Sequence, residues 1–277
     1  MASSMTGLRI VFLGTGGAAN ERRNQACLMV ARADPALPPI LLDTGNGLGV
    51  VRSLIGAGVD PLSIQDVFVS HRHPDHAGGL DPLLLWRRLH LMRAGRPSAE
   101  AGLRVHTEPR TMTALLHTFE VTASGTPASL GGALQWHRLT DGQPSPLPDG
   151  QLIPFLVDHL PVDGGAMGCV LEIDGVKIAY SGDTRPTPRL IEAVRGADIL
   201  LHEAGGLDAD ADRVHRPCHS TAGDAGRAAQ AAGVRHLVLT HLSDDSILDA
   251  LLAEAQANFG GPVTMAVDGG SVQISPL

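Results

Sequence analysis

Cysteine is scarce in this chain of 277 residues, which excludes two ways of building a protein or a metal site. Only Cys27, Cys169 and Cys218 occur, and no two of them form a C-x-x-C pair. The chain therefore offers neither a disulfide framework nor a thiolate zinc site. Scattered cysteines fit a reducing compartment, and we expect a cytoplasmic protein.

Long apolar runs are also missing. The run from Ile10 to Leu13 stops at Gly14, and residues 1–7 lack the basic segment that opens a secretory signal. No stretch approaches the roughly 20 apolar residues that span a bilayer. The sequence therefore predicts no membrane partner.

Basic and aromatic side chains are few. The chain has 21 Lys and Arg against 29 Asp and Glu, and its formal charge of −8 repels polyanions. The densest basic stretch, Arg87 to Arg96, lies on or just after a predicted helix, where charges are normally a solvated face. One tyrosine, two tryptophans and five phenylalanines allow a base-stacking platform but do not indicate one. We expect a small-molecule substrate and do not expect tRNA as a partner.

Short β-branched runs alternate with helical spacings along most of the chain. Predicted strands span 8–13, 27–31, 39–42, 66–70, 103–106, 152–157, 169–173, 176–180, 199–202 and 237–240, and predicted helices span 47–56, 81–94, 111–119, 189–194 and 221–232. The Pro- and Gly-rich stretch 141–150 reads as a surface loop between two mixed halves. Two such halves predict an α/β fold of stacked sheets with outer helices, in a single domain over residues 1–277.

The strongest chemical signal follows the predicted strand 66–70. His71, His73, Asp75 and His76 occur within six residues. Imidazole and carboxylate are the ligands that zinc and other first-row metals take in hydrolytic sites. A polar loop with incidental histidines is the alternative, but four ligand-type side chains directly after a buried strand favour a metal site.

Three further candidate ligands, His159, Asp183 and His241, also lie at or just beyond strand ends. Strand ends on one edge of a sheet converge, so these residues can complete one site. Alone, His159 could be an ordinary core or surface histidine, and Asp183 could start a turn or cap a helix. Together the seven predict two ions about 3.5–4 Å apart that hold a hydroxide between them.

An ordered set of motifs spans nearly the whole chain: Phe12-Leu13-Gly14-Thr15-Gly16, Leu42-Asp43-Thr44-Gly45, the H-x-H-x-D-H run from His71 to His76, His159, Gly182-Asp183-Thr184, His202-Glu203-Ala204, His219-Ser220-Thr221 and Leu239-Thr240-His241. This set resembles the metallo-β-lactamase superfamily, and within it the ribonuclease Z-like branch. The resemblance implies a four-layered αββα sandwich with the site along one edge of its two sheets.

The resemblance also implies roles for individual residues. His71, His73 and His159 would bind one zinc ion, Asp75, His76 and His241 the other, and Asp183 would bridge them, with manganese as a second choice of metal. Asp75 would also handle the proton of the attacking water, and His219 would stabilise the transition state or protonate the leaving group. Without the family context, His219 is equally well explained as a residue at the start of a helix.

Some positions stay open. Asp43 either supports a ligand histidine from behind or serves as a turn residue before Gly45. His202 and Glu203 are unassigned, because the chain continues with glycines where the branch has a hydroxyl residue. Only residues 160–182 separate His159 from Asp183, which leaves room for a hairpin but not for the long arm of tRNA-processing members. A homodimer, common in this branch, is left open.

The sequence therefore predicts a zinc-dependent phosphodiesterase acting on small phosphodiester or nucleotide-like substrates. Hydrolysis of an ester, lactone, thioester or sulfate ester by the same site is the alternative. An iron-dependent oxidoreductase is less favoured, because oxygen-reducing members carry a glutamate where this chain has His73, and persulfide-oxidising members usually lack a histidine like His219. The pocket walls are expected from the loops 93–102 and 118–132.

Overall fold

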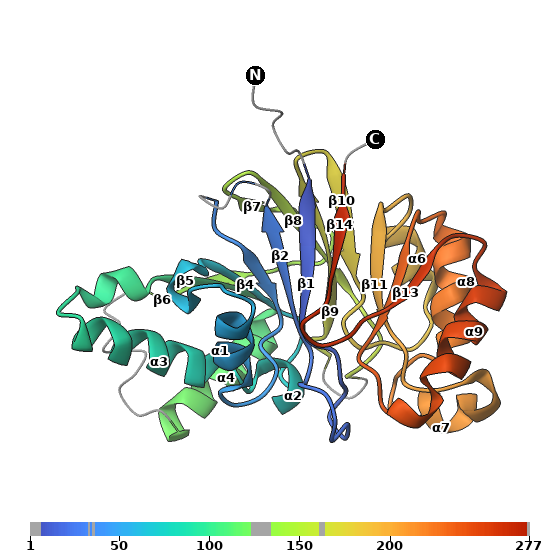
Figure 1. Cartoon of the computed structure of the whole chain (residues 1–277), viewed down its shortest axis with the longest axis horizontal. Helices are drawn as coiled ribbons and strands as arrows, with labels where there is room; N and C mark the ends of the chain where they lie inside the picture. Colours follow the sequence, from blue (N-terminus) through green and yellow to red (C-terminus); the bar gives the residue numbers. More distant parts are fainter. Residues whose placement is uncertain (1–6, 33, 35–36, 123–133, 161–163, 276–277) are drawn as a thin grey trace.

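Two seven-stranded sheets pack face to face, with helices on both outer faces (Figure 1). The computed structural model describes residues 7–32, 34, 37–122, 134–160 and 164–275. The first sheet contains, in spatial order, β14 (Ser271–Ile274), β1 (Leu8–Gly14), β2 (Cys27–Arg32), β3 (Ile40–Leu42), β4 (Asp66–Val69), β5 (Leu103–Thr107) and β6 (Leu134–Arg138). The second contains β13 (Val263–Met265), β12 (Leu237–Thr240), β11 (Ile199–Glu203), β10 (Val176–Tyr180), β9 (Met167–Ile173), β8 (Gly150–Leu156) and β7 (Ser145–Leu147).

Most of the helices form the two outer layers of the fold. Packed on the first sheet are α1 (Gly49–Gly56), α3 (Leu80–Arg93) and α4 (Pro109–Thr122), and packed on the second are α6 (Pro188–Ala193), α8 (Ala222–Ala232) and α9 (Leu248–Asn258). The short helices are α2 (Pro74–Ala77) and α7 (Ala211–His215), with 3₁₀ turns η1 (Pro61–Ser63), η2 (Ser98–Ala101), η3 (Asp208–Asp210) and η4 (Asp245–Ile247). Within the described part of the chain, no helix combines the length and apolar character needed to cross a bilayer.

Alternation along β1 shows how the sequence builds the four layers. Ile10 and Phe12 point into the core between the sheets, whereas Val11 and Leu13 belong to the core under the first helical layer. Successive side chains of a strand point to opposite faces, so a strand buried on both sides reads as a continuous apolar run. A third core lies between the second sheet and its helices. The predicted four-layered αββα sandwich is therefore confirmed.

Parallel pairing brings the ends of several strands to one edge. β3, β4 and β5 run parallel in the first sheet, and β10, β11 and β12 run parallel in the second. β8 shares the direction of β10, because both pair antiparallel with β9. The segments that follow β4, β8, β10 and β12 carry the predicted ligands, so the topology places them at this edge.

The predicted strands and helices are all present, with ends that differ by a few residues. The prediction of a plain loop over residues 141–150 was wrong. This stretch contains β7, which pairs with β8 through Ser145 and Leu152. The sequence analysis also missed β6, α9, β13 and β14. β7 and β13 have only three residues each, too few for a periodic signal.

Asp66 is a buried carboxylate at the start of β4, at the end of the strand remote from the ligands. It accepts hydrogen bonds from Arg104 Nε at 2.7 Å and Nη2 at 2.6 Å, and it lies 2.9 Å from His106 Nε2. Burial by itself would raise the pKa of Asp66, but these contacts lower it to about 2. The folded pKa lies below the roughly 3.9 of an unfolded aspartate. This interaction therefore stabilises the fold above pH about 4 and is lost as the pH falls toward 2.

We expect Asp66→Asn to lower the free energy of unfolding by about 2 kcal/mol at pH 7, because Arg104 and His106 lose a charged partner. Urea denaturation followed by circular dichroism measures this, and the difference from wild type should shrink between pH 4 and pH 2. Glu100→Gln is the matched control, since it removes a carboxylate from the exposed Arg96–Glu100 pair. That change should cost less than about 0.5 kcal/mol. Equal losses in the two variants would contradict the assignment.

Candidate metal centre

The loop after β4 turns its side chains into the site through a short helix. His73 is the N-cap residue of α2, and Pro74 occupies the first helical turn. Proline is preorganised for that position, so the sequence fixes where the helix begins. Asp75 and His76 follow on this single turn and are buried. The H-x-H-x-D-H spacing thus places the candidate ligand atoms in one compact group.

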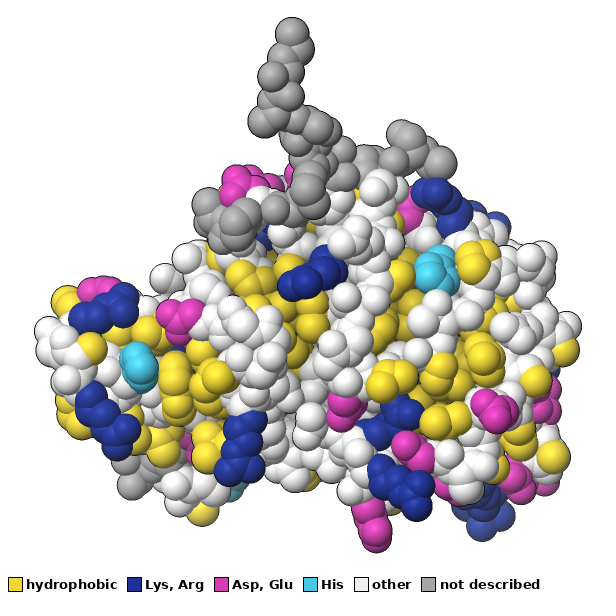
Figure 2. All heavy atoms as spheres, in the orientation of Figure 1, with side chains coloured by type: hydrophobic (Ala, Val, Ile, Leu, Met, Phe, Trp, Pro, Cys, Tyr) yellow, Lys and Arg dark blue, Asp and Glu magenta, His cyan; other side chains and the backbone are white. Residues whose placement is uncertain are grey.

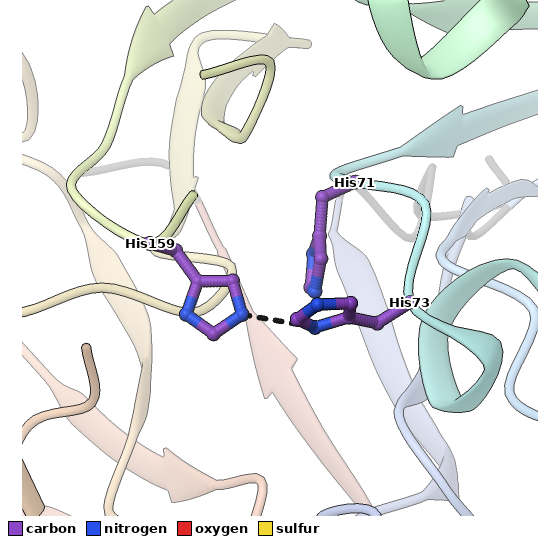
Figure 3. Close-up of side chains that lie close together, drawn as sticks. All are labelled: His71, His73 and His159. Carbon is purple, nitrogen blue, oxygen red and sulfur yellow. Dashed lines mark hydrogen bonds between the residues drawn. The ribbon is translucent and has the colours of Figure 1, made fainter. Parts of the chain in front are cut away.

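His71, His73 and His159 form the first of two groups at this edge (Figure 3). His159 comes from the loop after β8, and its Nε2 lies 3.1 Å from Nδ1 of His73. The ring centroid of His71 lies 4.6 Å from the ring centroids of His73 and His159. Two imidazole nitrogens on one tetrahedral zinc ion, with bonds near 2.0–2.1 Å, are about 3.3 Å apart. The observed spacing therefore fits three donors around one cation.

Asp75, His76 and His241 form the second group. Nε2 of His76 lies 3.2 Å from Nε2 of His241, and Oδ2 of Asp75 lies 3.3 Å from the same His241 atom. His241 follows β12 directly and has a φ of 53°, in the left-handed region that non-glycine residues seldom adopt. Such backbone strain clusters at functional sites, where the surrounding structure imposes it.

The carboxylate of Asp183 lies between the two groups. Its Oδ2 is 3.1 Å from Nε2 of His76, 3.5 Å from Nε2 of His241, 3.6 Å from Nε2 of His159 and 3.8 Å from Nε2 of His71. One carboxylate therefore faces donors of both groups, as a bridging ligand does. All seven predicted ligands are brought together.

Three atoms of the candidate ligands are buried without a hydrogen-bond partner, Asp183 Oδ1, His71 Nε2 and His241 Nδ1. Buried polar atoms in native proteins are nearly always partnered, because an unpaired one costs desolvation energy. Carboxylate oxygens and imidazole nitrogens are donors that divalent metals accept. The residues present therefore fit bound metal ions.

Electrostatics prepare the donors for cations. Burial lowers the pKa of His71, His73 and His159, which favours the neutral imidazole that binds metal. Burial by itself would also lower the pKa of His76, but Asp183 and Asp43 raise it well above its usual value. Burial by itself would raise the pKa of Asp183, but the neighbouring histidines His241 and His76 hold it well below the usual range of a carboxyl. Asp183 is therefore ionised and attracts positive charge.

Asp43 supports His76 from behind. Its Oδ2 lies 2.8 Å from Nδ1 of His76 and accepts hydrogen bonds from the hydroxyls of Ser70 at 2.7 Å and Tyr180 at 2.8 Å. A carboxylate on the remote nitrogen fixes the ring so that Nε2 faces the metal position. Nδ1 of His159 is held in the same way, 3.0 Å from the carbonyl oxygen of Cys218. These contacts favour the interpretation that Asp43 supports a ligand histidine over the interpretation that it is only a turn residue.

His219 lies at the rim of the site, beside the ligands. Its ring stacks on His241 at a centroid distance of 5.5 Å and packs against His159 at 4.9 Å. Helix α8 begins later, since Thr221 is its N-cap residue and forms a capping box with Asp224. The position of His219 is therefore not explained by helix capping alone.

Glu203 holds His219 in place and is the residue that sequence reasoning missed. It ends β11, and its Oε2 lies 3.0 Å from Nδ1 of His219. Burial alone would lower the pKa of His219, but the charge and hydrogen bond of Glu203 raise it to about 9. The sequence signals for Glu203 were its place at a strand end and the motif His202-Glu203-Ala204, and neither indicated its contact with His219. His202, in contrast, uses Nδ1 to contact the backbone oxygen of Glu203.

A cavity of about 380 Å³ opens over the ligands. Its described lining consists of Gly17, Ala18, Ala19, His73, Asp75, His159, Asp183, Gly205, Arg213, Val214, Pro217, His219, His241 and Ser243. A side chain at Gly17 would place its Cβ 3.0 Å from Cε1 of His241, so any other residue there would require the ring of His241 or the loop to shift. The walls are thus formed by segments that follow β1, β11 and β12.

The prediction that residues 93–102 form a wall of the pocket was wrong, because none of them is among the described residues that line this cavity. They precede β5 and so lie at the opposite end of the parallel strands. Residues 118–122 end α4 and do not line it either, whereas 123–132 lie outside the described residues.

Comparison with known proteins gives concordant results. A model of the β-lactamase superfamily domain matches residues 39–242. An uncharacterised protein of Mycobacterium leprae is 32% identical over 267 residues, covering 96% of this chain and 89% of the relative. Ribonuclease Z of Methanosarcina acetivorans is 33% identical, covering 85% of this chain and 88% of the relative. The metallo-β-lactamase fold protein YhfI of Bacillus subtilis superposes with a TM-score of 0.81 at 21% identity, covering 97% and 100% of the two chains. The chain therefore belongs to the metallo-β-lactamase superfamily, in its ribonuclease Z-like branch.

Proposed function

We propose that the protein is a two-metal hydrolase that cleaves small phosphodiesters with Zn²⁺ or Mn²⁺. The observation that carries this proposal is the carboxylate of Asp183, whose Oδ2 lies within 3.1–3.8 Å of histidines from both ligand groups. His71, His73 and His159 would hold one ion and Asp75, His76 and His241 the other, with Asp183 shared. The similarity to a ribonuclease Z supports a phosphodiester as the reacting group.

The two ions, when bound, would lower the pKa of a water molecule and neutralise negative charge on the substrate oxygens. Asp75 lines the cavity as well as the second ligand group, so its carboxylate can accept a proton from the attacking water. His219 lies across the cavity edge with Nδ1 bound to Glu203, which leaves Nε2 to give a proton to the leaving oxygen. Glu203 acts as a positioning residue, because it fixes the ring of His219.

The short segment between His159 and Asp183 is consistent with a small substrate. Most of its described residues form the β9–β10 hairpin, which spans 167–180 and turns at Asp174 and Gly175. Both strands of this hairpin belong to the second sheet, so nothing in the described part of the segment projects as a tRNA-gripping arm. The substrate is therefore a compact molecule that enters the cavity of about 380 Å³.

The function is tested by loading the purified protein with Zn²⁺ or Mn²⁺ and assaying phosphodiesters beside carboxylic esters, lactones, thioesters and sulfate esters. We expect the phosphodiesters to react fastest. Rapid turnover of an ester with no phosphodiester cleavage would replace the proposal with the alternative hydrolase. Elemental analysis of protein from unsupplemented cells should find zinc or manganese, whereas iron would favour an oxidoreductase.

Removing a ligand should remove metal and activity together. We expect His73→Ala and Asp183→Ala each to lower phosphodiester cleavage by about 10³-fold or more, since the site loses a donor and its charge balance. Elemental analysis should show less metal per chain in both variants. His117→Ala is the control, because that histidine is exposed on α4 with a side-chain exposure of 78%. Wild-type rates in either ligand variant would refute the site.

Removing the proposed proton donor should slow turnover without removing metal. We expect His219→Ala to lower kcat by about 10²-fold for a diester with an alkoxide leaving group. The loss should be much smaller for a p-nitrophenolate leaving group, which departs without a proton. Glu203→Gln should show the same dependence on the leaving group with a smaller loss. An equal loss for both leaving groups would assign His219 a merely structural role.

A further inference from the structure

The cavity wall has no aromatic platform for a nucleobase. All the phenylalanine, tyrosine and tryptophan residues of the chain lie in its described part. The five phenylalanines and Tyr180 are buried in the cores, and Trp86 and Trp136 pack against the core of the first sheet. Beyond the candidate ligands and His219, the lining contains only small or aliphatic side chains, one serine and one arginine. The wall therefore favours a small, non-nucleoside group beside the reacting phosphate.

Arg213 is the only lysine or arginine among the described residues that line this cavity. It lies on α7 and its side chain is 70% exposed. Its contact with Asp210 is loose, with Nη2 of Arg213 3.6 Å from Oδ2 of Asp210. An exposed pair of this kind contributes little energy, so the guanidinium can turn to another anion at small cost. Asp75 and Asp183, the lining carboxylates, belong to the ligand groups.

The segment that carries Arg213 is anchored to the helices behind it. Asp208, just before α7, receives a hydrogen bond from Arg227 Nη1 on α8 at 2.7 Å. His215, at the end of α7, has Nε2 2.7 Å from Oδ2 of Asp224. The same part of the surface, at the lower right of Figure 2, shows basic and acidic side chains next to one another. These contacts hold the backbone of Arg213 at the cavity mouth and leave its side chain free to reorient.

We propose that Arg213 determines specificity by binding a second anionic group of the substrate, a carboxylate or a phosphate, on an arm beside the scissile phosphodiester. This inference rests on the proposed function and narrows its substrate class to small, doubly anionic diesters without a nucleobase. The planar guanidinium fork matches both carboxylate and phosphate oxygens in two-point hydrogen bonds. Arg213 is the one fixed positive charge in the described lining of a protein whose net charge is −8, so it is the lining side chain best suited to attract an anion.

The test compares three p-nitrophenyl phosphodiesters whose second arm is ethyl, 2-carboxyethyl or 2-phosphoethyl. For the wild type we expect kcat/KM to be about tenfold higher for a charged arm than for ethyl, mainly through KM. Arg213→Gln should reduce this ratio to about one, and Arg213→Lys should keep part of it. Arg216→Gln is the matched control, since Arg216 is exposed in the same segment but does not line the cavity. It should keep the full ratio.

Calorimetric titration with the three corresponding phosphonates, which cannot be hydrolysed, provides a second readout. The charged phosphonates should bind about tenfold more tightly than the ethyl one to the wild type and to Arg216→Gln, but not to Arg213→Gln. The arm that gains more identifies the preferred anion. Equal affinities in the wild type, or a ratio that survives Arg213→Gln, would overturn the role of Arg213. Failure of the proposed function looks different, because then none of the three diesters is cleaved.

Discussion

The site depends on one constraint, the crowding of buried nitrogen and oxygen donors around the carboxylate of Asp183. Four imidazole nitrogens lie within 3.1–3.8 Å of its Oδ2. Buried donors at this spacing are stable only when they share a positive charge, either a proton or a bound cation. The donors come from segments that follow four different strands, β4, β8, β10 and β12, and four of the seven lie on the loop after β4. The arrangement is therefore one that can hold cations, and the candidate ligands are the residues that would bind them.

Asp43 joins this centre to the core of the fold. It lies directly after β3 in the first sheet, with a φ of 59°, and binds the hydroxyl of Tyr180 from the second sheet at 2.8 Å. The same carboxylate orients His76 and accepts hydrogen bonds from the backbone and side chain of Ser70. Buried networks of this kind are stable only when every member is satisfied. The packing of the two sheets and the orientation of a candidate metal ligand are therefore set by the same hydrogen bonds.

The sequence predicted those features that short-range pattern determines. Apolar runs identified the central strands, and the H-x-H-x-D-H run indicated a candidate metal site, because ligand type and spacing are both local. The edge strand β14 was missed because its four residues give too short an alternating signal and it gains its partner only by pairing with β1, far away in sequence. Glu203 was left unassigned because its function appears only in its contact with His219. The cavity walls were wrong for a related reason, since loop packing leaves no periodic signal.

The structure separates the parts that determine chemistry from those that determine specificity. The candidate metal ligands follow β4, β8, β10 and β12, and they are fixed by buried hydrogen bonds inside the sandwich. The α7 segment is anchored instead by ion pairs on the outside of α8, such as Asp208–Arg227, which do not touch the ligands. Substitutions on α7 can therefore change the cavity mouth while the ligand geometry stays intact. Under the proposed function, the candidate ligands would carry the hydrolysis, whereas the α7 segment at the cavity mouth would select the substrate.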